Sequence, residues 1–151
     1  MLFSMNLDEV MVMAKISIIG AGFVGSTTAF ALVNQNIADE IVLVDINKDR
    51  AEGEALDLAN GLVYSNTAQI NYSDKYDVTK DSDIIIITAG LAQKPGETRL
   101  QLVENNARIM KGILTKLKKY NKKAIYVLVT NPVDVLTYVA KKVLGEDCRV
   151  F

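Results

Sequence analysis

The sequence contains no histidine and no tryptophan, and it has only one cysteine and two prolines. The single cysteine, Cys148, cannot form an internal disulfide, which favours a reducing compartment such as the cytoplasm. No apolar run approaches the roughly 20 residues that a bilayer span requires. Neither charge predominates, because 17 basic residues face 18 acidic ones. We therefore expect a protein that spans no membrane, binds no nucleic acid and holds no metal ion.

The N-terminal stretch MLFSMNLDEVMV lacks the basic start and the small-residue cleavage site of a secretion signal. Met13 directly precedes the first strong strand pattern, so residues 1–13 are expected to be an N-terminal extension or the result of an alternative start. Residues 14–151 are expected to form one domain, because the chain is too short for two ordinary ones.

Short apolar runs rich in β-branched residues alternate with helical patterns along the chain. Such near-continuous runs are typical of strands buried on both faces. The predicted strands cover residues 15–20, 40–45, 83–90 and 123–130, with weaker ones at 68–73 and 148–151. The predicted helices cover residues 24–35, 48–59, 100–119 and 132–144. The alternation predicts an α/β fold of the Rossmann type, a doubly wound parallel sheet of about six strands with helices on both faces.

A glycine-rich turn lies directly between the first predicted strand and the first predicted helix. Gly20 permits a tight turn, Gly22 lets the backbone approach a pyrophosphate, and Gly25 lets helix and strand pack closely. Asp45 ends the second predicted strand, where a carboxylate accepts hydrogen bonds from both hydroxyls of an adenosine ribose. This combination predicts a dinucleotide site. The alternative is that the glycines serve only a turn and that Asp45 only caps a strand or helix.

The residue types around Asp45 favour NAD over NADP. A 2′-phosphate is repelled by the Asp45 carboxylate, and Ile46 offers no compensating charge. Lys48 and Arg50 keep NADP open as the alternative.

A polar loop, residues 88–99, leads into the long third predicted helix. Loops at the carboxyl ends of strands in a doubly wound sheet face the ligand, so this loop is placed to act as a lid. Arg99 offers a planar, permanently charged fork that stabilises alkoxide charge on a substrate oxygen. The alternative is a solvated arginine at a helix start.

Three blocks of sequence resemble bacterial L-lactate dehydrogenases of the lactate/malate dehydrogenase family, in that family's order and spacing. The blocks are GAGFVGSTTAFAL, TAGLAQKPGETRLQLVENNARIM and VTNPVDVLTYVA, and the resemblance runs from about Lys15 to Phe151. It implies an NAD-binding domain with cofactor positions at Gly20, Gly22, Val24, Gly25, Asp45, Arg50, Tyr76, Gly90, Asn106, Val129, Thr130 and Asn131. Arg50, Tyr76 and Asn106 are equally compatible with ordinary surface or packing positions.

The same resemblance implies a substrate role for three residues. Gln93 falls on the substrate-specificity position, Arg99 on the mobile-loop arginine that polarises the reacting carbonyl, and Asn131 on a substrate contact beside the nicotinamide. A neutral Gln93 suits the methyl end of pyruvate, whereas the second carboxylate of oxaloacetate or malate calls for an arginine. Lactate chemistry is therefore expected, with malate as the alternative.

In this family, a histidine held by an aspartate donates the proton of the reaction. A further arginine binds the substrate carboxylate. Because the sequence has no histidine, we expect a catalytic substrate domain to lie outside this chain and the chain alone to be inactive. The resemblance also implies a homo-oligomer, specifically a homotetramer, with a contact along residues 50–59. A stand-alone NAD-binding module, or a structural domain that has lost cofactor binding, is the remaining alternative.

Lysines gather near the end of the third predicted helix. Their positions near a helix C-terminus favour a solvated face that opposes the negative end of the helix dipole, rather than an anion site. These residues are Lys116, Lys118, Lys119, Lys122 and Lys123.

Overall fold

The computed structural model describes residues 14–61 and 69–151, so the expected extension over residues 1–13 lies outside the described residues. One parallel sheet with the strand order β3-β2-β1-β4-β5 forms the centre of the molecule. Its strands are β1 (Lys15–Ile19), β2 (Glu40–Val44), β3 (Gln69–Ser73), β4 (Ile84–Ile87) and β5 (Ile125–Leu128). The predicted α/β fold with a doubly wound parallel sheet is confirmed.

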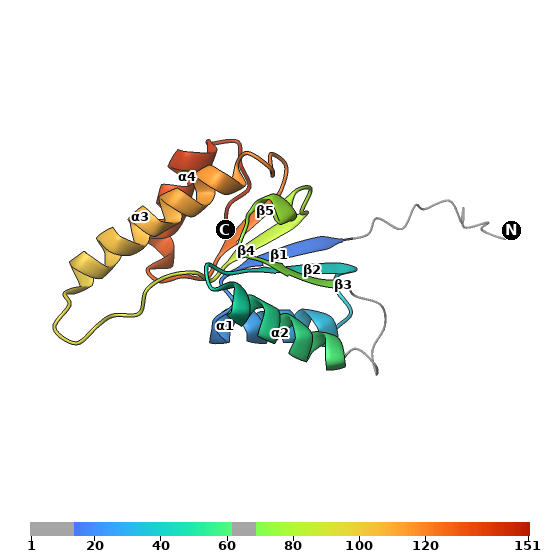
Figure 1. Cartoon of the computed structure of the whole chain (residues 1–151). Coiled ribbons are helices and arrows are strands. Elements are labelled where there is room, and N and C mark those ends of the chain that lie inside the picture. Colours follow the sequence, from blue (N-terminus) through green and yellow to red (C-terminus); the bar gives the residue numbers. More distant parts are fainter. Residues whose placement is uncertain (1–13, 62–68) are drawn as a thin grey trace, which may run out of the picture.

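Helices cover both faces of this sheet. The helices α1 and α2 lie on one face and α3 and α4 on the other (Figure 1). Their bounds are α1 (Phe23–Asn34), α2 (Lys48–Gly61), α3 (Arg99–Leu117) and α4 (Val133–Leu144), and a 3-10 turn, η2 (Asp77–Thr79), precedes β4. Among the described residues, no helix is both long and apolar enough to cross a membrane.

Each face of the sheet has its own apolar core, which explains why the strands read as continuous apolar runs. In β1, Ile16 and Ile18 pack toward α1 and α2, whereas Ile19 belongs to the core under α3 and α4. All three side chains are at most 2% exposed. A central strand buried on both sides fixes the relative positions of the two helical layers and of the loops that join them.

The prediction of about six strands is wrong by one within the described residues. The sixth predicted strand, residues 148–151, forms a single parallel bridge between Val150 and Tyr126. Backbone hydrogen bonds join Tyr126 to Arg149 and to Phe151, and Leu128 to Phe151. One bridge does not make a strand, so the sheet has five strands here.

The predicted strands also end too late at the carboxyl edge of the sheet. The amides of Thr88 and Ala89 both donate to the carbonyl of Ile19, so the chain leaves the ladder after Ile87. Gly20 and Asp45 lie just beyond β1 and β2 in the same way. Gly20, Asp45, Thr88 and Ala89 therefore lie in turns at the carboxyl edge of the sheet. At this edge β1 leads to the layer of α1 and α2, and β4 leads to the layer of α3 and α4. Such a switch point is where doubly wound sheets bind ligands.

Side-chain capping sets the start of α3. Thr98 accepts a hydrogen bond from the amide of Gln101, and the Gln101 side chain accepts one from the amide of Thr98. This reciprocal capping box makes Arg99 the first helical residue, one residue earlier than predicted. Arg99 thus stands at the junction of the loop and a rigid helix.

Candidate functional site

The turn after β1 requires glycine at two positions. Gly20 has φ +105°, and a Cβ there would lie 2.8 Å from the amide nitrogen of Ala89. A Cβ on Gly25 would overlap the carbonyl oxygen of Gly20. A Cβ on Gly22 would meet nothing within 4 Å. The turn is therefore closed toward the protein and open at Gly22, where α1 begins without a side-chain cap.

Asp45 connects the end of β2 to this turn. Its Oδ2 accepts a hydrogen bond from the amide of Ala21 at 2.8 Å, and its Oδ1 accepts one from the amide of Asn47 at 2.9 Å. Each oxygen has a further lone pair for a ligand hydroxyl. The carboxylate is thus held in place before any ligand arrives.

A groove of about 450 Å³ runs past the glycine turn and Asp45. Its volume lies within the usual range of small-molecule sites. The groove brings together six of the predicted cofactor residues, namely Gly20, Gly22, Asp45, Arg50, Tyr76 and Gly90. It is completed by residues without a predicted role, namely Ile19, Val44, Ile46, Thr88, Ala89, Leu91, Ile109, Ile113 and Lys116.

The lining of the groove includes apolar side chains and the phenol ring of Tyr76. Ile109 and Ile113 of α3 contribute apolar lining, and the Lys116 ammonium lies 5.3 Å from the centroid of the Tyr76 ring. Burial, followed by the negative charge of Asp45, raises the pKa of Tyr76 above its ordinary value. A groove whose lining combines apolar side chains with a fixed carboxylate suits a flat base attached to a ribose.

A second hollow, of about 330 Å³, contains all three predicted substrate residues. Gln93, Arg99 and Asn131 line it together with Leu102, Val103 and Pro132. The Gln93 side-chain amide donates to the carbonyl of Glu97 at 2.8 Å. Among the described residues, ion pairs join only Lys15 to Glu40 and Lys142 to Glu146, so the Arg99 guanidinium is unpaired. The hollow therefore offers an unpaired cation and two neutral amides.

Asn106 is buried and lines neither hollow, but its side chain is hydrogen-bonded to one lining residue of each, Leu91 and Asn131. Its Oδ1 accepts from the amide of Leu91 at 2.8 Å, and its Nδ2 donates to the carbonyls of Leu91 and Asn131, both at 3.2 Å. With 2% of its surface exposed and its polar side-chain atoms hydrogen-bonded to the backbone, Asn106 fits the packing position that the sequence also allowed, and its cofactor contact stays a prediction. It positions the loop after β4 against the loop after β5.

The remaining predicted cofactor residues occupy less direct positions. Val24 in the first turn of α1 is 53% exposed and lines neither hollow. Val129, just after β5, also lies outside both hollows, and its amide donates to the carbonyl of Ile87. Thr130 is buried, and its hydroxyl donates to the carbonyl of Ala89 at 2.9 Å. This hydrogen bond holds the backbone next to Gly90 in place.

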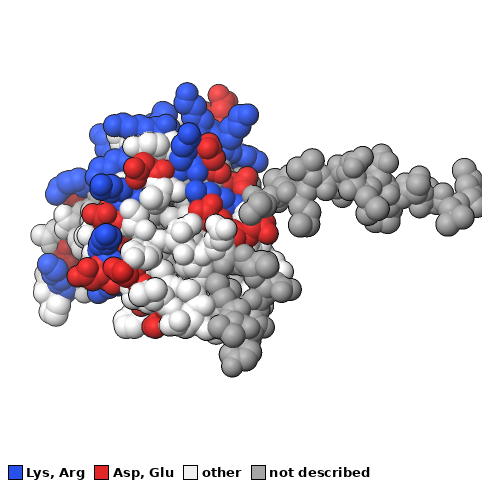
Figure 2. All heavy atoms as spheres, turned by 45° about the vertical axis from the view of Figure 1, so that its right-hand side comes forward, with Lys and Arg blue, Asp and Glu red and all other residues white. Residues whose placement is uncertain are grey.

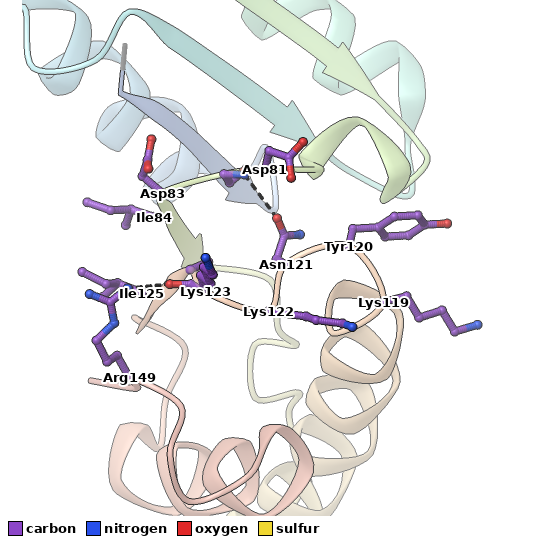
Figure 3. A pocket seen from close by; sticks show the side chains of 12 residues that line it. Asp81, Asp83, Ile84, Lys119, Tyr120, Asn121, Lys122, Lys123, Ile125 and Arg149 are labelled. Atoms are coloured by element: carbon purple, nitrogen blue, oxygen red, sulfur yellow. Dashed lines mark hydrogen bonds between the residues drawn. The ribbon is translucent and has the colours of Figure 1, made fainter. Parts of the chain in front are cut away.

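A larger hollow, of about 690 Å³, lies at the opposite, amino edge of the sheet. Figure 3 shows its two sides, the turn with Asp81 and Asp83 and the loop between α3 and β5 with Lys119, Lys122 and Lys123. Asn121 points at the turn, while Lys119 extends away from it (Figure 3). Lys and Arg side chains gather on the upper part of the face drawn in Figure 2, and this hollow has charges of both signs.

The profile of the family described as "lactate/malate dehydrogenase, NAD binding domain" matches residues 14–150. The chain belongs to this family. Its expected family membership and its expected cofactor, NAD, are thereby confirmed. Lys116 lines the groove of this NAD-binding domain and is also exposed to solvent, which agrees with the solvated face predicted for the lysine-rich stretch.

Curated relatives from the family are similar over most of the chain. An L-lactate dehydrogenase of Thermoanaerobacter sp. (strain X514) is 58% identical over 133 residues, which is 88% of this chain and 42% of the relative. L-lactate dehydrogenase 1 of Clostridium acetobutylicum is 56% identical over 131 residues, covering 87% of this chain and 42% of the relative. The chain therefore spans about two fifths of the length of these relatives.

Solved structures of family members share the fold. The minor L-lactate dehydrogenase of Enterococcus mundtii, in a ligand-bound form, superposes with a TM-score of 0.84 at 41% identity, over 87% of this chain and 42% of that one. An apo malate dehydrogenase of Picrophilus torridus gives a TM-score of 0.82 at 39% identity, over 87% of this chain and 42% of that one. Backbone similarity alone thus does not separate lactate from malate chemistry.

Proposed function

We propose that this NAD-binding domain serves an L-lactate dehydrogenase that interconverts pyruvate and L-lactate. The observation that carries the proposal is the hollow in which Gln93, Arg99 and Asn131 meet beside the dinucleotide groove. NADH, when held by the groove residues, would supply the hydride. Arg99 binds and polarises the substrate oxygen, and Asn131 orients the substrate from the end of β5.

Gln93 carries the choice of pyruvate over oxaloacetate. Its side chain is a neutral amide that already donates to the Glu97 carbonyl, so it offers no cation to a second carboxylate. A dicarboxylate would bring a second carboxylate into this hollow, where Arg99 is the one cation among the described lining residues. Because Arg99 is needed by the reacting oxygen, the second carboxylate would stay unpaired. The methyl group of pyruvate has no such need, and this difference favours a lactate enzyme over a malate enzyme.

Proton donation belongs to residues outside these 151. The sequence contains no histidine, and within the described residues no other titratable group lines the hollow with Arg99. We propose that a substrate domain supplies the proton donor and the clamp for the substrate carboxylate. The chain alone would then bind the cofactor without turning over substrate.

We also propose that the protein acts in the cytoplasm as a homo-oligomer. Exposed apolar side chains lie on the layer formed by α1 and α2, where Phe30 is 57% and Leu56 is 53% exposed. Burying this surface against a second copy would stabilise both subunits. Light scattering of the purified chain tests this, and a monomer at high concentration would contradict it for the isolated domain.

Calorimetric titration of the 151-residue chain with NADH tests the cofactor role. Saturable binding that is weakened at least about tenfold by Asp45→Ala is expected, because the carboxylate holds both the turn and the ribose site. A parallel assay with pyruvate should show no turnover. Absence of NADH binding by a folded chain would overturn the cofactor role, and robust pyruvate reduction would overturn the need for an external proton donor.

A further inference from the structure

The hollow at the amino edge gathers cations that have no carboxylate partner. Its lining holds four basic residues against two acidic ones, namely Lys119, Lys122, Lys123, Arg149, Asp81 and Asp83. The ion pairs among the described residues lie elsewhere, at Lys15–Glu40 and Lys142–Glu146. Opposite charges thus line one hollow of about 690 Å³ without meeting, and positive charge is in excess.

Neither acidic residue is placed to neutralise the cations. One oxygen of Asp83 accepts a hydrogen bond from the amide of Lys15 at 2.9 Å, at the start of β1. Asp81 is exposed in the turn before β4, where it has φ +61°. Both carboxylates lie on the turn side of the hollow (Figure 3). The cations of the opposite side are therefore available to an anion that enters the hollow.

Two of these cationic residues are held next to each other. The Arg149 guanidinium donates a hydrogen bond to the backbone carbonyl of Lys123, which is one of the dashed lines in Figure 3. This bond uses one of the five N–H groups of the guanidinium, so the others stay available to a ligand. Holding a guanidinium beside a lysine costs electrostatic energy, and an anion between the two would relieve that repulsion.

A buried backbone amide lies at the same place. Ala124 directly follows Lys123 and is 5% exposed, yet its amide has no hydrogen-bond partner among the described residues. The next amide, that of Ile125, donates to the carbonyl of Asp83 at 2.9 Å, as strand pairing requires. Buried backbone N–H groups are almost always paired. An unpaired one beside two cations therefore indicates an acceptor that comes from outside the chain.

Uncharged side chains hold the two sides of the hollow in place. Asn121 accepts a hydrogen bond from the amide of Ser82 at 3.2 Å and donates one to the hydroxyl of Thr79 at 2.8 Å. Asn121 and Ser82 are both buried. The loop that carries the lysines is thus tied to the turn, so an anion can bind without first ordering the loop.

We propose that this hollow is an anion site, in which Lys123, Arg149 and the amide of Ala124 bind a phosphate group and Lys122 adds a further positive charge. A phosphate monoester carries roughly −1.5 to −2 charges and three terminal acceptor oxygens at neutral pH. This charge and oxygen count match two cations and one amide, whereas a carboxylate offers one charge and two oxygens. The site lies at the opposite edge of the sheet from the glycine turn and does not depend on the cofactor role.

NMR titration of the ¹⁵N-labelled 151-residue chain tests the site at constant ionic strength. Inorganic phosphate represents a free anion, and glycerol 2-phosphate represents a phosphate ester. A saturable downfield shift of the Ala124 amide is expected, because a charged acceptor strengthens the hydrogen bond that this amide donates. Saturation by both ligands supports a site for phosphate groups in general, and saturation by inorganic phosphate alone supports a site for the free anion.

Charge-removing variants assign the binding to named side chains. Lys123→Met and Arg149→Gln should each weaken phosphate binding at least about fivefold, and Arg149→Lys should weaken it less because the charge is kept. Lys111→Met is the matched control, since Lys111 is an exposed lysine of α3 that does not line the hollow. Arg50→Gln is the corresponding control in the dinucleotide groove. Both controls should leave the response of the Ala124 amide within about twofold of the wild type.

Three results would overturn the site. They are shifts that grow linearly without saturation, saturable shifts confined to residues 20–25, and an Ala124 response that Lys123→Met and Arg149→Gln leave unchanged. Because Arg149 also holds the carbonyl of Lys123, Arg149→Gln can fail to fold. The double variant Lys122→Met, Lys123→Met leaves that contact in place and then carries the test, with a loss of at least about tenfold expected. Unchanged phosphate binding in this folded double variant would refute the proposal.

Discussion

The two edges of the same sheet differ in how their polar groups are satisfied. The amino edge has the larger hollow, about 690 Å³ against about 450 Å³ for the groove at the carboxyl edge. Its polar groups bind one another, since Asn121 accepts from the amide of Ser82 and donates to the Thr79 hydroxyl. At the carboxyl edge, Arg50 and Arg99 have no ionic partner among the described residues. Lys122 and Lys123 at the amino edge also lack an ion-pair partner among the described residues, so the glycine turn with its fixed Asp45 identifies the dinucleotide site, rather than unpaired charge or the size of a hollow.

The largest expected effect comes from closing the glycine turn. Gly25→Ala places a Cβ against the carbonyl of Gly20, where neither backbone can give way. We expect NADH affinity to fall at least about 100-fold and the free energy of unfolding to fall by about 3 kcal/mol. Calorimetry and urea unfolding measure the two effects.

The matched control for this change is Gly112→Ala, in the exposed part of α3. A Cβ there meets nothing within 4 Å, so a gain of about 0.5–1 kcal/mol in stability is expected, with NADH affinity unchanged. If Gly25→Ala bound NADH as tightly as the wild type does, the glycine turn would not be part of the cofactor site.

Asn121→Ala should lower the stability of the fold without changing NADH binding. Asn121 is 4% exposed and its side chain joins Ser82, Thr79 and the carbonyl of Leu117. Loss of these bonds leaves buried groups unsatisfied and should lower the free energy of unfolding by about 2–3 kcal/mol. NADH affinity should stay within about twofold, because the amino edge does not contact the cofactor. A large loss of affinity in a folded variant would show that the two edges are coupled.

Alkaline pH tests the same network through Tyr126, whose hydroxyl donates to the carbonyl of Asn121. Burial, reinforced by Cys148, raises the pKa of Tyr126 from 10.0 to about 12. The unfolded chain therefore loses this proton before the folded chain does. The resulting stabilisation is complete below pH 10 and is lost as the pH approaches 12, by about 2 kcal/mol.

Urea unfolding of the wild type and of Tyr126→Phe between pH 8 and 12 measures that loss. The wild type should be the more stable protein at pH 8, and the difference should shrink above pH 10. A constant difference across this range would mean that the hydroxyl ionises equally easily in both states.

The smallest effect is expected for the lysines that line the larger hollow at the amino edge. Replacing Lys122 and Lys123 with methionine keeps their aliphatic stems but removes two charges from the larger hollow. Neither lysine forms an ion pair among the described residues, so the free energy of unfolding should change by less than about 0.5 kcal/mol. NADH affinity should not change. A loss of NADH affinity would assign a ligand role to the amino edge.

Local sequence patterns predicted the parts of the fold that depend on local chemistry. The glycines of the turn and the strand-like runs follow from backbone sterics and burial, which one sequence reveals. Strand ends were predicted too late. The amides of Thr88 and Ala89 both donate to the carbonyl of Ile19 in β1, so the regular strand pairing stops at Ile87. The missing sixth strand reflects pairing that only a tertiary contact decides.

The composition of the site was predictable only in part. Asp45 was predicted from the glycine-turn motif, whereas the substrate role of Arg99 followed only from the resemblance to the family. Ile109 and Ile113 line the groove from a helix face that reads as ordinary core, so no sequence signal separated them from their neighbours. Lys116 was grouped with a lysine-rich run, although its position on α3 turns it toward Tyr76. Asn106 proved to be a buried connector, because its hydrogen bonds depend on two distant loops.

Amide hydrogen exchange with and without NADH tests the contrast between the edges most directly. The account predicts that NADH slows exchange at residues 20–25 and 88–91, around the carboxyl-edge groove, and leaves residues 119–125 at the amino edge unchanged. Protection centred on residues 119–125, with none at the glycine turn, would contradict it.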